Sequence, residues 1–131
     1  MNSIGQRQSL FPITATVNPK GQMEVAGYEL AVLAKQYGTP LYLYDAATIY
    51  AQVSNLDALL HDKYEGASAI AYASKAYFSL AFAGKLAKLG IGADLITIGD
   101  IRTAQTAKLD PQKLHLHGNN KSEEEIRAAL E

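Results

Sequence analysis

The sequence has 131 residues, 48% of them hydrophobic and 19% charged, which predicts a single globular domain. Its 12 basic and 13 acidic residues give a formal net charge of −1, so no long-range attraction favours nucleic acid or an anionic membrane as a partner. The lack of cysteine excludes disulfides and cysteine-ligated zinc, and the lack of an apolar targeting segment or membrane-length run leads us to expect a soluble, cytoplasmic protein.

The first part of the chain predicts mostly local structure. We expect a loose leader over residues 1–12, a hairpin over residues 13–25, a short helix over residues 28–37 and a strand over residues 41–44. The hairpin prediction rests on alternating apolar residues around Asn18-Pro19-Lys20-Gly21, a sequence typical of turns.

A longer helix is expected over residues 46–61. Asp45 can cap its first turn, and apolar residues recur along it at helical spacing. After this helix, the predicted strands and helices alternate along the chain.

The expected strands cover residues 69–73, 93–96 and 113–117, and a helix follows each of them. Such alternation with short connections predicts parallel strands covered by helices. Three units of this kind do not close a barrel, and they leave sheet edges and apolar helix faces without partners. We therefore expect an α/β fold that is an incomplete, truncated (β/α)8 barrel, with its first three βα units preceded by the hairpin, the short helix and the strand.

One lysine stands where parallel α/β folds place functional groups. Lys75 directly follows an apolar strand in Ala71-Tyr72-Ala73-Ser74-Lys75-Ala76, and functional side chains gather at the carboxyl ends of such strands. A desolvated lysine amine there can hold a carbonyl cofactor as an imine. The alternative is a solvated lysine whose stem packs on apolar surface.

An acidic residue interrupts the next apolar strand. Asp94 needs a cation or several hydrogen-bond donors if it is buried, and it could interact with Lys75 if both face the same end. A hydrogen bond to a nearby backbone turn would explain Asp94 equally well.

The third strand carries His115 and His117 on one face, where they could chelate a metal. No third ligand is evident, so a half-exposed strand face explains them better. The following Gly118-Asn119-Asn120-Lys121-Ser122 offers donors for an anion at a helix N-terminus, but ordinary capping also explains it.

Four segments together resemble the diaminopimelate/ornithine/arginine decarboxylase family, which has the alanine-racemase-like fold. They are Tyr37-Gly38-Thr39-Pro40-Leu41-Tyr42-Leu43-Tyr44-Asp45, Ala71-Tyr72-Ala73-Ser74-Lys75-Ala76, Leu89-Gly90-Ile91-Gly92-Ala93-Asp94 and His117-Gly118-Asn119-Asn120-Lys121-Ser122. The last segment favours the diaminopimelate branch. Each segment is weak alone, and their order and spacing carry the resemblance.

The resemblance implies a barrel over residues 46–131 that binds pyridoxal 5'-phosphate, with residues 1–45 contributing to a β domain. It implies that Lys75 is the catalytic, cofactor-binding lysine, that Ala73 lines the cofactor and that Asp94 is the acidic residue near this lysine. The implied reaction is the decarboxylation of meso-diaminopimelate to L-lysine in lysine biosynthesis, by a full-length enzyme that forms a homodimer. No metal is implied.

Two departures from the family pattern bear on this interpretation. Thr97-Ile98-Gly99-Asp100 stands where the family usually has Ser-Gly-Gly-Glu, and Ala76-Tyr77 stands where it often has Ala-Asn. The resemblance also implies that the ring-stacking histidine, the phosphate loop and the glutamate at the pyridine nitrogen lie beyond residue 131. We therefore expect this chain alone to be inactive in decarboxylation.

Three other interpretations remain open on the sequence. The chain could belong to a pyridoxal-phosphate racemase or cofactor-handling protein of the same fold. It could be a non-catalytic remnant that binds a partner chain. It could also be a small, complete flavodoxin-like domain, which should unfold cooperatively.

Overall fold

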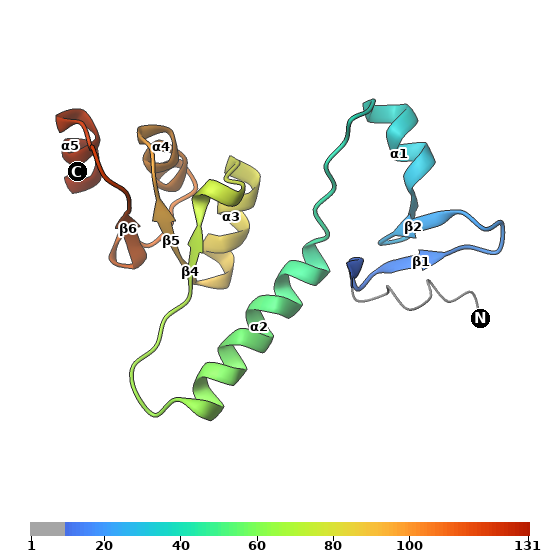
Figure 1. Ribbon diagram of the computed structural model, residues 1–131, viewed down its shortest axis with the longest axis horizontal. Coiled ribbons are helices and arrows are strands. Elements are labelled where there is room, and N and C mark those ends of the chain that lie inside the picture. The colour runs from blue at the N-terminus through green and yellow to red at the C-terminus, as the bar shows by residue number, and fades with distance from the viewer. Residues whose placement is uncertain (1–9) are drawn as a thin grey trace. The chain divides into compact units, whose positions relative to one another are not determined.

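A computed structural model describes residues 10–131 (Figure 1). The expected leader therefore lies largely outside the described residues. By its internal contacts the chain forms two compact units, Met1–Leu60 and His61–Glu131. None of the helices described over residues 10–131 is long and apolar enough to cross a bilayer.

The first unit contains a three-stranded antiparallel sheet. Its strands are β1 (Ala15–Val17), β2 (Met23–Val25) and β3 (Tyr28–Glu29), in the order β1-β2-β3. The expected turn joins β1 to β2, and Asn18 Oδ1 accepts hydrogen bonds from the amides of Lys20 and Gln22, both at 3.0 Å. The hairpin prediction is thus confirmed.

The strand β3 was not expected from the sequence. Residues Ala26 and Gly27 both have positive φ, 51° and 80°, and turn the chain back so that β3 pairs with β2. Helix α1 (Leu30–Tyr37) therefore begins two residues later than the periodicity predicted.

The prediction of a strand over residues 41–44 is wrong, because the backbone there is irregular. Strand propensity needs a neighbouring strand to take up the backbone hydrogen bonds. None of the strands described in residues 10–131 provides such a partner, and Tyr42 is 85% exposed. Helix α2 (Ala46–Lys63) follows as expected, with the Thr48 amide donating to Asp45 Oδ2 at 3.1 Å.

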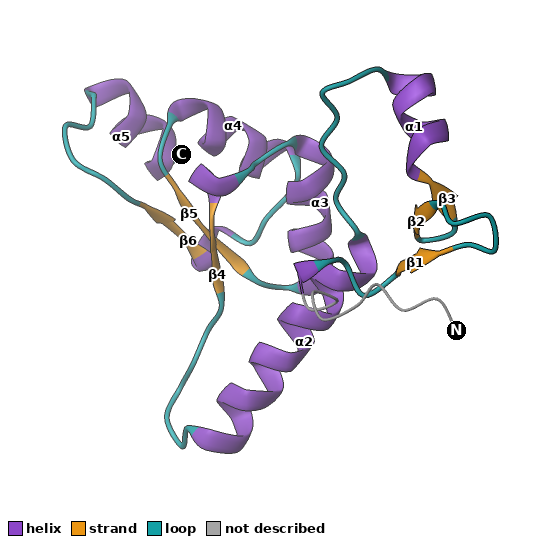
Figure 2. Ribbon diagram, turned by 45° about the vertical axis from the view of Figure 1, so that its right-hand side comes forward, coloured by secondary structure: helices purple, strands orange, loops and turns teal. Residues whose placement is uncertain are grey.

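The second unit contains three parallel strands, each followed by a helix (Figure 2). Sheet order is β4-β5-β6, with β4 (Ala71–Ala73), β5 (Gly92–Leu95) and β6 (Leu114–Leu116). The helices are α3 (Leu80–Leu89), α4 (Ile98–Thr106) and α5 (Glu123–Leu130), with single 3-10 turns η2 (Ser74–Ala76) and η3 (Pro111–Lys113). The predicted parallel βα units are confirmed, and they form an open sheet rather than a closed barrel.

The core of the second unit lies between this sheet and its helices. Its buried apolar side chains are Phe82, Ala83, Leu86, Ala93, Leu95, Ile101, Ala104 and Leu109. Because Ala93 and Leu95 point into this core, the alternation of side chains along β5 places Asp94 on the opposite face of the sheet.

Candidate functional site

The candidate site lies at the carboxyl ends of the parallel strands. The structure places Ala73 as the last residue of β4 and half-buried, and it places Lys75 in η2 directly after that strand, with an exposed side chain. The 3-10 turn bends the chain at the strand end, so that the lysine is carried by a defined turn rather than by the sheet.

Asp94 and His115 form a pair across β5 and β6. Ala73, Asp94 and His115 occupy matching register positions on three adjacent strands, and Asp94 Oδ1 lies 3.0 Å from His115 Nδ1. Within residues 10–131, no ion pair joins Asp94 to Lys75. The register nevertheless brings Asp94 beside Ala73, two residues before Lys75 in the chain.

A second carboxylate anchors the turn that carries Lys75. Asp100 Oδ2 accepts hydrogen bonds at 3.0 Å from the Ser74 hydroxyl and from the amides of Ile96 and Thr97. Ser74 is 4% exposed, so its hydroxyl needs such an acceptor. The Asp100 carboxylate thereby links η2 to the first turn of α4.

These hydrogen bonds also govern the protonation of Asp100. Burial of the carboxyl group raises the pKa of Asp100. Hydrogen bonds from the Ile96 and Thr97 amides and from the Ser74 hydroxyl lower this pKa, and together they outweigh the effect of burial. The net result is a pKa below the ordinary value of 3.8, so the carboxyl group is ionised at neutral pH.

Sequence reasoning missed the roles of Ser74 and Asp100. A signal was present, because Thr97 and Asp100 have the spacing of a capping box, and the structure shows that box at the start of α4. The bond from Ser74 to Asp100 joins residues 26 positions apart, and local pattern analysis does not reach that far.

Aromatic rings support the same turn from the helix side. The Phe82 ring of α3 lies with its centroid 4.8 Å from that of Tyr72 and 5.7 Å from that of Tyr77. Such tilted and edge-on contacts are favourable for aromatic rings. Phe82 therefore contacts the chain just before and just after the lysine turn.

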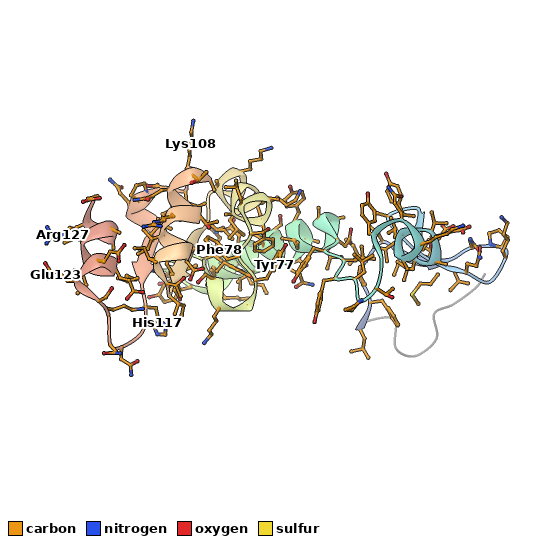
Figure 3. The ribbon with its side chains drawn as sticks, turned by 90° about the horizontal axis from the view of Figure 1, so that it is seen from above. Tyr77, Phe78, Lys108, His117, Glu123 and Arg127 are labelled. Atoms are coloured by element: carbon orange, nitrogen blue, oxygen red, sulfur yellow. The ribbon has the colours of Figure 1, made fainter. Side chains whose placement is uncertain are left out.

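The segment after β6 is a helix cap rather than an anion site. Ser122 and Glu125 form a capping box, and the first turn of α5 carries three glutamates, whose charges disfavour an anion. Lys121 Nζ donates to the Ile96 carbonyl oxygen, which ties this segment to the end of β5. In Figure 3, Glu123 and Arg127 project from α5, where they form an ion pair of 2.6 Å, and His117 lies on the segment before it.

No group of three or more potential metal ligands occurs among residues 10–131. His115 is instead engaged with Asp94. The chemistry offered by the site is therefore an exposed amine, two nearby carboxylates and an imidazole.

The family model and the relatives that match this chain point to the same protein family. Residues 46–131, well over half of the chain, match the family model described as pyridoxal-dependent decarboxylase, pyridoxal binding domain. The chain is 40% identical over 122 residues to a diaminopimelate decarboxylase of Halalkalibacterium halodurans, and the alignment covers 92% of this chain and 27% of that protein. It is 38% identical over 118 residues to the Bacillus subtilis enzyme of the same name, covering 90% of this chain and 27% of that protein.

A solved structure gives the same answer for the fold. The crystal structure of diaminopimelate decarboxylase from M. jannaschii in complex with L-lysine matches with a TM-score of 0.80 and 31% identity, over 90% of this chain and 28% of that one. The chain thus spans roughly a quarter of the length of these relatives. It belongs to the pyridoxal-dependent decarboxylase family, within the pyridoxal binding domain, and it is a homologue of diaminopimelate decarboxylases.

Proposed function

We propose that this chain is the part of a pyridoxal-phosphate-dependent diaminopimelate decarboxylase that carries the cofactor lysine, and that Lys75 is that lysine. The observation that carries the proposal is the position of Lys75, which is exposed in a turn at the carboxyl end of β4 within the matched domain. This is the position from which a barrel strand presents a reacting group.

The residues around Lys75 fit a cofactor that bears an aldehyde. The exposed amine can bond to a carbonyl carbon, Ala73 offers a small side chain at the strand end, and Asp94 supplies a negative charge in register beside it. When bound, the pyridoxal group supplies a ring that withdraws electrons from the bond to the departing carboxylate. The chain itself supplies the attachment point, the acidic group and, at His115 Nδ1, a site that can hold a proton beside Asp94.

We propose meso-diaminopimelate as the substrate and L-lysine as the product of the whole enzyme. The names of the relatives and the L-lysine in the related crystal structure support this proposal. We also propose that the whole enzyme is a homodimer, and that residues 1–45 contribute to a β domain, to which the antiparallel sheet of the first unit would belong. The chain corresponds to about 27% of its relatives, so we expect no decarboxylation by this chain alone.

An absorbance titration with pyridoxal phosphate tests the role of Lys75. The wild-type chain should develop a saturable band that is absent in Lys75→Ala and retained in Lys88→Ala, which removes an exposed lysine of α3. A band of equal size in Lys75→Ala would show that Lys75 is not the cofactor lysine.

The substrate is tested by replacing the matching segment of the Bacillus subtilis relative with residues 10–131. The hybrid should release carbon dioxide from meso-diaminopimelate and lose this activity on Lys75→Ala. A folded hybrid that binds the cofactor but acts on ornithine or arginine would refute the proposed substrate.

A further inference from the structure

We propose that Asp100 is a positioning residue for Lys75, and that it acts through the hydroxyl of Ser74. The proposal rests on the proposed role of Lys75 as the cofactor lysine. It adds that the turn carrying this lysine is held in a reactive conformation by a carboxylate on a different βα unit.

The contacts around η2 point to such a link. Ser74 precedes Lys75 in the same 3-10 turn, and its hydroxyl donates to Asp100 Oδ2 at 3.0 Å. Ser74 is the one buried polar side chain identified among the described residues, which excludes water as an easy substitute for this acceptor. The link is therefore the polar contact that fixes the first residue of the turn.

Asp100 is itself held in place by its own helix. The amides of Ile96 and Thr97 donate to the same oxygen that receives the Ser74 hydroxyl, and Thr97 Oγ1 accepts from the Asp100 amide at 3.2 Å. A carboxylate with several fixed donors cannot swing away without leaving those donors unpaired. Asp100 thus offers η2 a rigid anchor on the neighbouring βα unit.

A fixed turn matters for the lysine because binding at a flexible residue must first order the backbone. Because the turn is already ordered in the folded chain, attachment at Lys75 costs only the conformational entropy of the lysine side chain. Removing the Ser74 hydroxyl should therefore weaken attachment at Lys75 without removing any group that touches the cofactor.

The test compares variants of the full 131-residue chain in one assay. Each is incubated with pyridoxal phosphate, reduced with borohydride and mapped by peptide mass, so that attachment at Lys75 is measured separately from other lysines. Ser74→Ala and Asp100→Ala should each lower apparent affinity at Lys75 by roughly tenfold, the effect of losing a charge-assisted hydrogen bond. Asp100→Asn keeps an acceptor oxygen and should recover part of the loss.

Ser122→Ala is the matched control. It removes the hydroxyl that caps α5, which is bonded to Glu125 and not to η2 or Asp100, so it should lower thermal stability while attachment at Lys75 stays near the wild-type level. Amide hydrogen exchange in residues 74–77 gives a second readout, which should accelerate in Ser74→Ala and not in Ser122→Ala.

The outcomes separate this inference from the proposed function. Specific labelling of Lys75 in the wild type, with equal affinity and unchanged exchange in Ser74→Ala, would overturn the positioning role and leave the cofactor role standing. A loss in Ser122→Ala equal to that in Ser74→Ala would also overturn it, because general destabilisation would then explain both. Wild-type labelling spread over many lysines would overturn the cofactor role and this inference together.

Discussion

Nδ1 of His115 lies 3.0 Å from Oδ1 of Asp94, and the two residues are direct register partners on the parallel strands β5 and β6. Their side chains are 65% and 41% exposed. The contact is an ion pair only when His115 is protonated, and otherwise a hydrogen bond. Because both groups remain solvated, the pair orients the Asp94 carboxylate more than it stabilises the fold.

We predict that His115→Ala changes the free energy of unfolding by no more than about 1 kcal/mol, as is usual for exposed pairs. If His115 orients Asp94, the same change should weaken cofactor attachment at Lys75. Urea unfolding and the borohydride assay measure the two effects, with His61→Ala as a control on a histidine outside the site. A stability loss of several kcal/mol would contradict the view that the pair is solvated.

The low pKa of Asp100 predicts how stability depends on pH. At this site the folded chain binds fewer protons than the unfolded chain in acid, because hydrogen bonds lower the folded pKa below 3.8. The resulting stabilisation is fully present above the unfolded value and is lost as the pH falls through the folded value. Asp100→Asn should therefore be less stable than wild type at pH 7, and the difference should shrink as the pH falls below 3.8.

Thermal unfolding measured from pH 7 down to pH 3 checks this prediction. Asp110→Asn is a suitable control, because it also replaces a capping aspartate, at η3. A difference between wild type and Asp100→Asn that grows towards acid pH would have the wrong sign.

Gly92 permits the close approach of β5 to the chain entering β6. A Cβ atom at Gly92 would lie 2.0 Å from the carbonyl oxygen of Lys113, and a backbone atom cannot rotate away. Gly92→Ala must therefore separate the two segments, and we expect it to cost about 1–3 kcal/mol, as overpacking does. Chemical denaturation measures this cost.

Gly84 provides the matched control within α3. A Cβ atom there would meet nothing within 4 Å, and alanine favours a helix more than glycine does. Gly84→Ala should raise the free energy of unfolding by up to about 1 kcal/mol. Equal destabilisation by both substitutions would show that the chain does not pack as described.

Local sequence signals predicted the βα units well. Ser79 and Ser122 cap α3 and α5, and Gly90 ends α3 in the left-handed conformation. These features depend on residues within one turn of each other, so periodicity and capping rules locate them.

Features that depend on distant partners were predicted poorly. The residues around Tyr42 have the composition of a strand but no strand beside them, and β3 forms only because Ala26 and Gly27 return the chain to β2. The bond from Ser74 to Asp100 joins two βα units, and no local rule pairs a serine after one strand with an aspartate after the next. The placement of Lys75 directly after a strand was predicted because that position is itself a local feature.

The role of Lys75 is tested most directly by the distribution of label after borohydride reduction of the chain with less than one equivalent of pyridoxal phosphate. We expect most of the label on the peptide containing Lys75, and we expect Lys75→Ala to lower total incorporation instead of moving it to Lys85 or Lys88. Label shared among exposed lysines in proportion to their exposure, and unchanged in total by Lys75→Ala, would show that Lys75 is not the cofactor lysine.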